Sequence, residues 1–341
     1  MTDQKIEPSS YLPEFFPEYN PDRDGITQGL LQMWLACREK ARLFLYGLDR
    51  PRRVFIFGTI LHTALEIVYN AHKISSGISI PIDPSLIEGA VDTAGEIWIQ
   101  DNPGYTESDL KELEFSIATL CGILPVYFNH WRSDFELKRW ICLEEEFSVD
   151  FYGSLLRGKV DGAFSEKGNS NIFLFETKGL SRIVESSLLD RLSLDFQTNF
   201  YVTAIAKMYE SKVGGVTYNI IRNPQNQIKS GENLRRFSER MKSYALADPD
   251  YYFFRYEVSL LETEQVRFSE SLRRILSEFK AWWMSLSGQT HPDHTPSSLI
   301  HFRNTNSCED RYGTCQFLPI CANGDLSKFR VRDKLYPELS T

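Results

Sequence analysis

Three strand-like segments that are separated only by short turns constrain the fold of this 341-residue chain more than any other feature. Their sequences are KRWICLEEEFSVDF (138–151), SLLRGKVDGAFS (154–165) and SNIFLFETKG (170–179). Apolar and polar residues alternate along them, which is typical of strands with one buried face, and short turns join strands that pair side by side. The sequence therefore predicts an antiparallel three-stranded meander.

Segments with helical periodicity lie on both sides of this meander. Before it we expect helices at 26–48 and 54–72 and two more within 84–138, separated at DNPG (101–104). After it we expect helices at 186–210, 233–248 and 262–286, with strands at 214–223 and 251–260. This order predicts an α/β fold, in which a mixed central sheet is flanked by helices and preceded by a helical layer.

We divide the chain into four regions on this basis. They are a flexible N-terminal arm (1–25), a helical region (26–137), the α/β core (138–286) and a cysteine-rich tail (287–341). Hydrophobic residues make up 42% of the chain, which is enough for a large core. The formal net charge of −8 means that any contact with DNA depends on local cations or bound metal ions. We find neither a long apolar run nor a signal-peptide pattern, and therefore expect a cytoplasmic location.

Acidic residues stand at the facing ends of the second and third strands. Asp161 lies in GKVDGAF, and period-two alternation places Glu176 and Lys178 of FLFETKG on one face. If the two strands pair, Asp161 and Glu176 lie opposite each other, and neighbouring carboxylates favour a bound Mg²⁺ or Mn²⁺ ion. Such an ion can activate water against a phosphodiester. Singly, the Asp is typical of a turn and the Glu-x-Lys of a solvated face, so the hypothesis of a catalytic site depends on their combination.

GKVDGAF followed by FLFETKG resembles the core of the PD-(D/E)xK nucleases, and in particular their RecB-like branch. Further upstream, GTILH, with Gly58 and His62, is similar to the helical Gly-x-x-x-His motif of that branch. The resemblance implies that His62, Asp161 and Glu176, together with the carbonyl of Thr177, hold one or two Mg²⁺ or Mn²⁺ ions. It also implies that Lys178 positions the attacking water.

The segment QTNFY, with Gln197 and Tyr201, is similar to the Gln-x-x-x-Tyr motif of the same branch. Residues four apart share one face of a helix, so both side chains can meet a DNA strand above the site.

The strand segment CLEEEF (142–147) supplies a further acidic candidate. In the RecB-like branch a Glu on the strand before the Asp often borders the metal site. Alternation places Glu144 and Glu146 on one face and Glu145 on the other. We favour Glu146, because Phe147 then faces the core, and three solvated acids are the alternative.

Three cysteines, Cys308, Cys315 and Cys321, lie close together in CEDRYGTCQFLPIC. In a reducing compartment such a group indicates a metal site rather than disulfides. Cys37 is the best candidate for a fourth ligand, since the remaining two cysteines lie in apolar helix and strand patterns. The residues alone leave open zinc, an iron–sulfur cluster and unligated thiols.

The resemblance favours the cluster. RecB-like nucleases of the AddB type and of the CRISPR-adaptation type carry one Cys before the Gly-x-x-x-His helix and three after the nuclease core, and these four bind a [4Fe–4S] cluster. The order here is the same, and the final Cys-x5-Cys spacing matches. The six residues between Cys308 and Cys315 depart from the usual two. A cluster held in this way ties the tail to the first helix.

As a whole the resemblance implies a DNA exonuclease that acts on single strands or ends, of the kind found free-standing in phages or beside CRISPR systems. The sequence has no GxxxxGK[ST] motif, so we expect a helicase, recombinase or integrase partner to supply direction and substrate. One alternative is a non-catalytic DNA-end-binding or scaffold subunit, against which the intact Asp161, Glu176 and Lys178 argue. Another is a zinc-stapled RNA nuclease.

Overall fold

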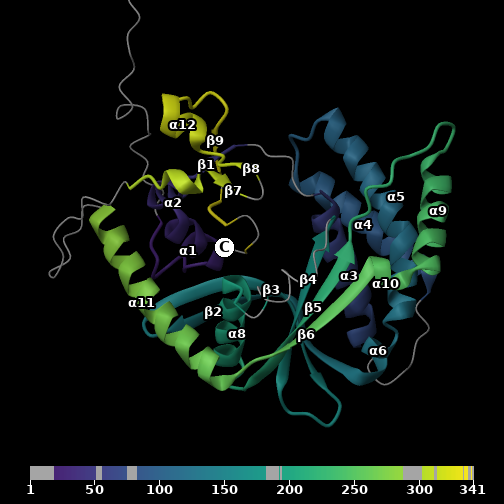
Figure 1. The fold of residues 1–341 in the computed structure, drawn as a ribbon, viewed down its shortest axis with the longest axis horizontal. Coiled ribbons are helices and arrows are strands. Elements are labelled where there is room, and N and C mark those ends of the chain that lie inside the picture. The colour runs from purple at the N-terminus through teal and green to yellow at the C-terminus, as the bar shows by residue number, and fades with distance from the viewer. Residues whose placement is uncertain are drawn as a thin grey trace, which may run out of the picture.

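A five-stranded mixed sheet forms the centre of the protein, with helices on both faces (Figure 1). The computed structural model describes residues 19–50, 56–74, 83–181, 192, 194–286, 302–310, 313–332, 334–336 and 339. The strand order is β2 (Lys138–Phe151), β3 (Ser154–Glu166), β4 (Ile172–Leu180), β5 (Val213–Arg222) and β6 (Phe253–Ser259). The first three strands pair antiparallel, as predicted, β4 and β5 pair in parallel, and β6 pairs antiparallel to β5.

Each face of the sheet buries its own hydrophobic core. One core is covered by α1 (Gln28–Ala36), α2 (Arg38–Leu45), α8 (Phe196–Met208) and α11 (Glu262–Leu286). The other is covered by α3 (Ile56–Ile74), α4 (Pro84–Asp101), α5 (Glu107–His130) and α9 (Leu234–Ala247). The short helices α6 (Ser133–Leu137) and α10 (Pro249–Tyr252) lead into β2 and β6. The predicted fold class, α/β with a mixed sheet between helices, is therefore confirmed.

Local sequence sets where several of these helices begin. The side chain of Thr106 accepts a hydrogen bond from Asp109 N, and that of Asp109 accepts one from Thr106 N, which is the capping box that starts α5. Asn233 caps α9 through Arg236 N. Such caps satisfy backbone donors that have no partner inside the helix and typically contribute about 1 kcal/mol each.

The first predicted helix is interrupted, and the prediction that placed Cys37 in the middle of a continuous helix is wrong. Cys37 has an extended backbone (φ −161°, ψ 116°) and separates α1 from α2. The side chains of Asn304 and Ser307 both donate to the carbonyl of Ala36, at 2.9 Å each. Tail residues therefore satisfy a helix-terminal carbonyl, and the chain can turn at Cys37.

Two other boundaries differ from the prediction. Within the helix expected at 186–210, Leu192 is helical, residues 194–195 interrupt the helix, and α8 begins at Phe196; residues 186–191 and 193 lie outside the described part of the chain. Part of the arm expected at 1–25 is packed, since Tyr19 is buried and its hydroxyl donates to the carbonyl of Gly25. Residues 1–18 and 287–301 are outside the described residues.

The tail lies against the first two helices (Figure 1). Its described elements are η1 (Thr305–Ser307), β7 (Glu309–Asp310), β8 (Gly313–Thr314), α12 (Leu318–Asn323) and β9 (Arg330–Val331). Strand β9 pairs antiparallel with β1 (Leu48–Asp49), which follows α2 directly. The tail is thus joined by backbone hydrogen bonds to the beginning of the fold.

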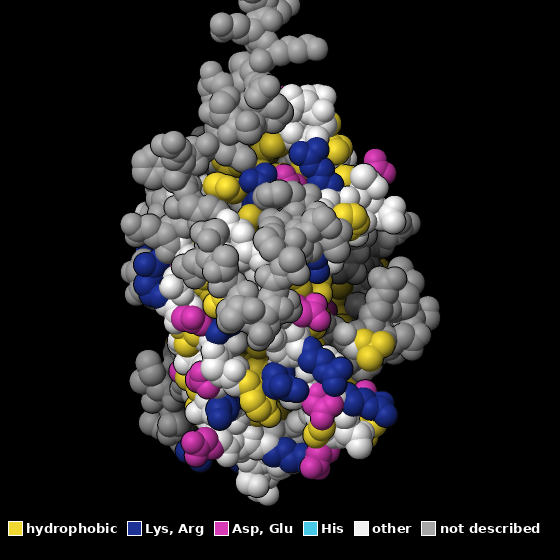
Figure 2. Space-filling view, turned by 90° about the vertical axis from the view of Figure 1, so that its left-hand side faces the viewer, with side chains coloured by type: hydrophobic (Ala, Val, Ile, Leu, Met, Phe, Trp, Pro, Cys, Tyr) yellow, Lys and Arg dark blue, Asp and Glu magenta, His cyan; other side chains and the backbone are white. Residues whose placement is uncertain are grey.

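On the face shown in Figure 2, the described Lys and Arg side chains are interspersed with Asp and Glu side chains. Among the described helices, none has both the length and the apolar character that a membrane span requires.

Candidate active site

The candidate site forms where strands β3 and β4 part. The pairing of the two strands ends at Gly162 and Phe175, so Asp161 and Glu176 follow at the point of divergence. The backbone N–H of Thr177 donates to Oδ2 of Asp161 at 2.7 Å. This side-chain contact takes the place of further pairing between the strands, and it opens a space between their ends.

An imidazole and two carboxylates meet in this space. Nδ1 of His62, on α3, lies 3.0 Å from Oε1 of Glu144 and 3.6 Å from Oδ1 of Asp161. Within the described residues, these are the three metal-ligating side chains whose donor atoms all lie within 4.8 Å of one another. They line a cavity of about 10 Å³ together with Thr177. That volume is near the space of one water molecule, and this donor set suits Mg²⁺ or Mn²⁺, so the residues fit a single divalent ion.

Glu144, rather than Glu146, is the acid that β2 contributes to this group. Glu144 has φ +45°, whereas its neighbours Leu143 and Glu145 pair regularly with β3. A left-handed backbone at a non-glycine residue costs roughly 1 kcal/mol and redirects the side chain out of simple alternation. Glu146 instead lies 3.9 Å from Arg157 NH2.

A second group of polar side chains adjoins the first. Nζ of Lys178 donates to Oε1 of Glu176 at 2.6 Å and to Oε1 of Gln197 at 3.3 Å. Nε2 of Gln197 donates to the same Glu176 oxygen at 3.1 Å and lies 3.4 Å from the hydroxyl of Tyr201. The structure therefore brings together the residues that the sequence suggested from β4 and from the following helix.

The start of α8 is fixed so that Gln197 faces β4. Asp195 caps the helix by accepting from Thr198 N at 3.0 Å. The buried hydroxyl of Tyr218, on β5, lies within hydrogen-bonding distance of two groups, 2.6 Å from Oγ1 of Thr198 and 2.8 Å from the carbonyl oxygen of Leu192. Because Gln197 is in the first turn, these bonds hold its amide against the end of the sheet.

Burial and the charges of neighbouring groups shift the pKa values of the site residues. Burial opposes protonation of His62, but the charges of Asp161 and Glu144 outweigh it and raise its pKa to about 9. Burial, together with the charge of Asp161, raises the pKa of Glu176 to about 7. Burial acts to raise the pKa of Glu144, but His62 and Lys159 lower it overall. The acids thus hold a proton on His62, and a divalent cation in the cavity has to replace that proton.

A model of the PD-(D/E)XK nuclease superfamily matches residues 30–322 of this chain, which is most of its length. The chain belongs to the PD-(D/E)XK nuclease superfamily. Membership indicates a metal-dependent nuclease, a phosphodiester hydrolase whose substrate is DNA. Among curated proteins, no sequence matches this chain.

A buried polar network supports the metal side of this PD-(D/E)XK site. Oγ1 of Thr177 accepts from Nδ2 of Asn219 at 3.3 Å, and Oδ1 of Asn219 accepts from Nε of Arg255 at 3.2 Å. Arg255 forms a two-point ion pair with Asp134, which also accepts from the hydroxyl of Tyr69 at 2.9 Å. Tyr69 lies two turns after His62 on α3. The network therefore links the helix of His62 to the strand of Thr177.

The four cysteines that were proposed as cluster ligands come from neighbouring elements of this nuclease. Cys308 and Cys315 flank the hairpin of β7 and β8, and Cys315 N donates to the carbonyl of Cys308 at 2.8 Å. Sγ of Cys37 lies 3.8 Å from the carbonyl of Phe302. Burial raises the pKa of Cys321 to about 11, and the charges of Glu39, Cys315 and Cys37 act in the same direction. The charges of Cys37 and Cys315 thus act on the thiol of Cys321.

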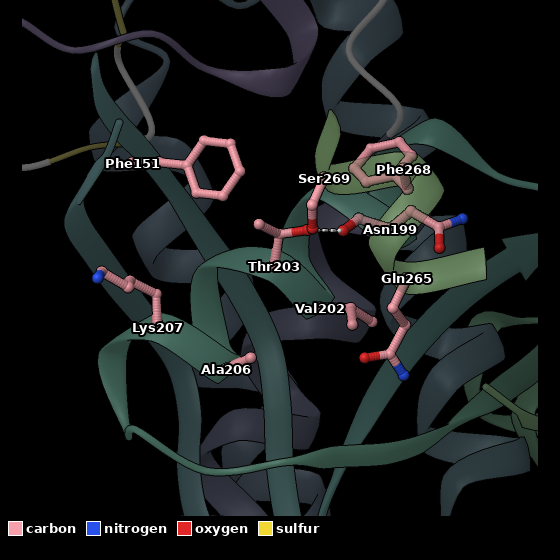
Figure 3. Close-up of a pocket in the computed structure, with 9 residues that line it drawn as sticks. All are labelled: Phe151, Asn199, Val202, Thr203, Ala206, Lys207, Gln265, Phe268 and Ser269. Carbon is pink, nitrogen blue, oxygen red and sulfur yellow. Dashed lines mark hydrogen bonds between the residues drawn. The ribbon is translucent and has the colours of Figure 1, made fainter. Parts of the chain in front are cut away.

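A larger cavity, of about 270 Å³, is lined in part by Asn199, Val202 and Thr203 of α8 (Figure 3). Helical periodicity places these residues on a different face of α8 from Gln197 and Tyr201. The walls of the cavity include Phe151, Phe268 and Thr203, and none of the described residues that line it is His, Asp or Glu. The hydroxyl of Thr203 donates to the carbonyl of Asn199 at 2.9 Å. Of these two cavities, the small one at His62 is the candidate active site, because its lining includes the imidazole of His62 and the carboxylates of Glu144 and Asp161.

Proposed function

We propose that the protein is a metal-dependent deoxyribonuclease, an exonuclease that acts on single strands or DNA ends. The observation that carries this proposal is the convergence of His62, Glu144 and Asp161 on an ion-sized cavity beside the Glu176–Lys178 pair. The ligands proposed for Mg²⁺ or Mn²⁺ are His62, Asp161, Glu176 and the carbonyl of Thr177. We add Glu144 to this set, because its carboxylate lies beside His62 and Asp161.

A divalent ion bound there would supply a Lewis acid for the phosphoryl oxygen and lower the pKa of water. Lys178 has a role that needs no metal contact. Its ammonium group lies against Glu176 and Gln197, so it can orient the attacking water and counter the charge that develops on the phosphorus oxygens. The amide of Gln197 and the hydroxyl of Tyr201 are proposed to contact the DNA strand.

We propose further that Cys37, Cys308, Cys315 and Cys321 hold a [4Fe–4S] cluster that fastens the tail to α1 and α2. A tetrahedral zinc site would require sulfur atoms about 3.8 Å apart, given Zn–S bonds of about 2.3 Å. Among the residues that the structure describes, no three cysteine sulfurs lie within 4.8 Å of one another. What supports the cluster is the order of the four cysteines along the chain, which resembles that of the iron–sulfur branch.

End-labelled single-stranded, blunt duplex and circular single-stranded DNA test the activity, each with Mg²⁺, Mn²⁺ or EDTA. We expect cleavage of linear DNA that requires the metal, and little cleavage of the circle. Asp161→Asn, Glu176→Gln and Lys178→Met should each lower kcat by at least about a hundredfold, because these groups act on charge that appears in the transition state.

Glu144→Gln and Glu146→Gln form a matched pair, since both change one acid of the same strand. We expect the first to impair cleavage strongly and the second to leave it near wild type. Equal activity of wild type and Asp161→Asn in the presence of Mn²⁺ would refute the proposed site. Efficient cleavage of the circle would refute the exonuclease assignment.

A further inference from the structure

Lys159 forms an ion pair with Glu144, a residue that lines the metal cavity, and the Asp-Glu-Lys motif assigns it no part. Its Nζ is 2.8 Å from Oε2 of Glu144, and its side chain is 36% exposed, against 8% for that of Glu144. The lysine therefore covers the carboxylate on the solvent side. It stands two residues before Asp161 on β3, and the alternating burial of the strand places both on one face.

Glu144 is shared between two cations. Its Oε1 faces Nδ1 of His62 at 3.0 Å, and its Oε2 faces Nζ of Lys159 at 2.8 Å. A divalent ion in the cavity would compete with both for the same carboxylate, and its charge would repel the ammonium group of Lys159. Lys159 therefore opposes metal binding as long as it stays on Glu144.

The position of Lys159 also suits a phosphate. Two residues along a strand span about 6.6 Å, which is comparable to the distance between neighbouring phosphates of an extended single strand. A lysine ammonium on a flexible stem contacts phosphate oxygens as a mobile point charge. When Glu144 and Asp161 are neutralised by a divalent ion, Lys159 keeps the nearby charge of Glu66 but loses the larger part of its compensation, so its ammonium group becomes more available to the substrate.

We propose that Lys159 is a substrate-binding residue that Glu144 retains in the metal-free protein and releases to the DNA phosphate beside the scissile one when the metal binds. This inference rests on the proposed function. It makes two predictions of opposite sign for one substitution: removing the ammonium group should strengthen metal binding and weaken DNA binding. A purely structural role for the lysine would instead weaken both, because Glu144 would lose its support.

The first measurement is a calorimetric titration of the cluster-loaded, full-length protein with Mn²⁺ in the absence of DNA. Lys159→Met should bind Mn²⁺ about tenfold more tightly, since one nearby positive charge and one competitor are removed. Lys159→Arg keeps the charge and should resemble the wild type. An affinity of Lys159→Met equal to or below that of the wild type would overturn the proposal.

The second measurement is the affinity for a short labelled single strand, with Ca²⁺ in place of Mg²⁺, at several salt concentrations. Lys159→Met should bind about tenfold more weakly, and the slope of log K against log salt should become shallower by about 0.7, the value for one phosphate contact to a single strand. An unchanged slope would overturn the phosphate contact.

Lys280→Met is the matched control. Lys280 is 20% exposed and pairs with Asp22 at 2.6 Å, so it is a comparable ion-paired lysine outside the site. It should leave the affinities for Mn²⁺ and for DNA unchanged, and a change equal to that of Lys159→Met would contradict a specific role. A wild-type protein that binds no Mn²⁺ would overturn the proposed function itself, whereas the outcomes above concern Lys159 alone.

Discussion

The protonation of His62 makes the stability of the metal-free protein fall as the pH rises. Its pKa is about 9 in the folded protein, against an ordinary value of 6.5. Because the folded value is the higher one, the stabilisation is fully present below about pH 6.5 and is lost as the pH rises through 9. The difference between the two pKa values corresponds to a contribution of about 3 kcal/mol to the free energy of unfolding. Because the side chain is 30% exposed, solvent screens these charges, and we expect His62 to contribute about 2 kcal/mol to the free energy of unfolding.

Urea unfolding in EDTA at a series of pH values between 6 and about 9.5 measures this loss. The reference is His62→Gln, which keeps a polar side chain but cannot titrate. The wild type should lose about 2 kcal/mol more than the variant over this range. Equal losses in the two proteins would show that Asp161 and Glu144 do not raise the pKa of His62, and would refute the reasoning.

Saturating Mn²⁺ should reverse the sign of the effect. Metal binding requires the neutral imidazole, so the ion binds more tightly as the pH rises and stabilises the folded state more. A wild-type protein whose stability falls with pH to the same extent in Mn²⁺ as in EDTA would contradict the assignment of His62 as a ligand.

Three further outcomes depend on other contacts of the molecule. Cys37→Ser should lose iron and melt at a lower temperature, whereas Cys142→Ser should keep its iron; metal analysis of both variants decides, and the reverse pattern would reassign the ligand. In Gly158→Ala the new Cβ would lie 2.7 Å from Phe147 and 3.3 Å from Tyr201. We expect it to weaken binding of single-stranded DNA several-fold while Mn²⁺ binding is unchanged, and an unaltered DNA affinity would show that Tyr201 has no part in binding. DNA affinity measured with Ca²⁺ should depend weakly on salt, with about two to four ions released, and a steep dependence that persists in EDTA would indicate a basic groove.

The sheet could be predicted because the residues that determine its strands and turns lie close together in the sequence. The turn between β2 and β3 contains Tyr152 and Gly153, both with positive φ, and the strands on either side alternate regularly. Asp161 and Glu176 could be expected to face each other because neighbouring strands in register fix which side chains are opposite. The break at Cys37 could not be predicted, because the groups that satisfy the carbonyl of Ala36 come from the other end of the chain.

For the same reason, the sequence could not predict which acid of β2 lies at the candidate site. Alternation treats Glu144 and Glu146 alike, and only the backbone at Glu144, with φ +45°, distinguishes them. That conformation accompanies contacts with His62, from a different element, and with Lys159 on the facing strand. No pattern within the segment CLEEEF indicates that Glu144 contacts these two residues.

The pairing of β1 with β9 has a consequence for biosynthesis. Leu48 leaves the ribosome early, but its partner Val331 is made only after the whole sheet and every helix that covers it. The ribosome adds roughly 5–20 residues each second. For many seconds, therefore, the surface of α1 and α2 that the tail later covers is exposed to water. Closing this contact across most of the chain is entropically costly and comes late in folding. A nascent chain halted before β9 therefore has to be protected from aggregation at its first two helices rather than at its sheet.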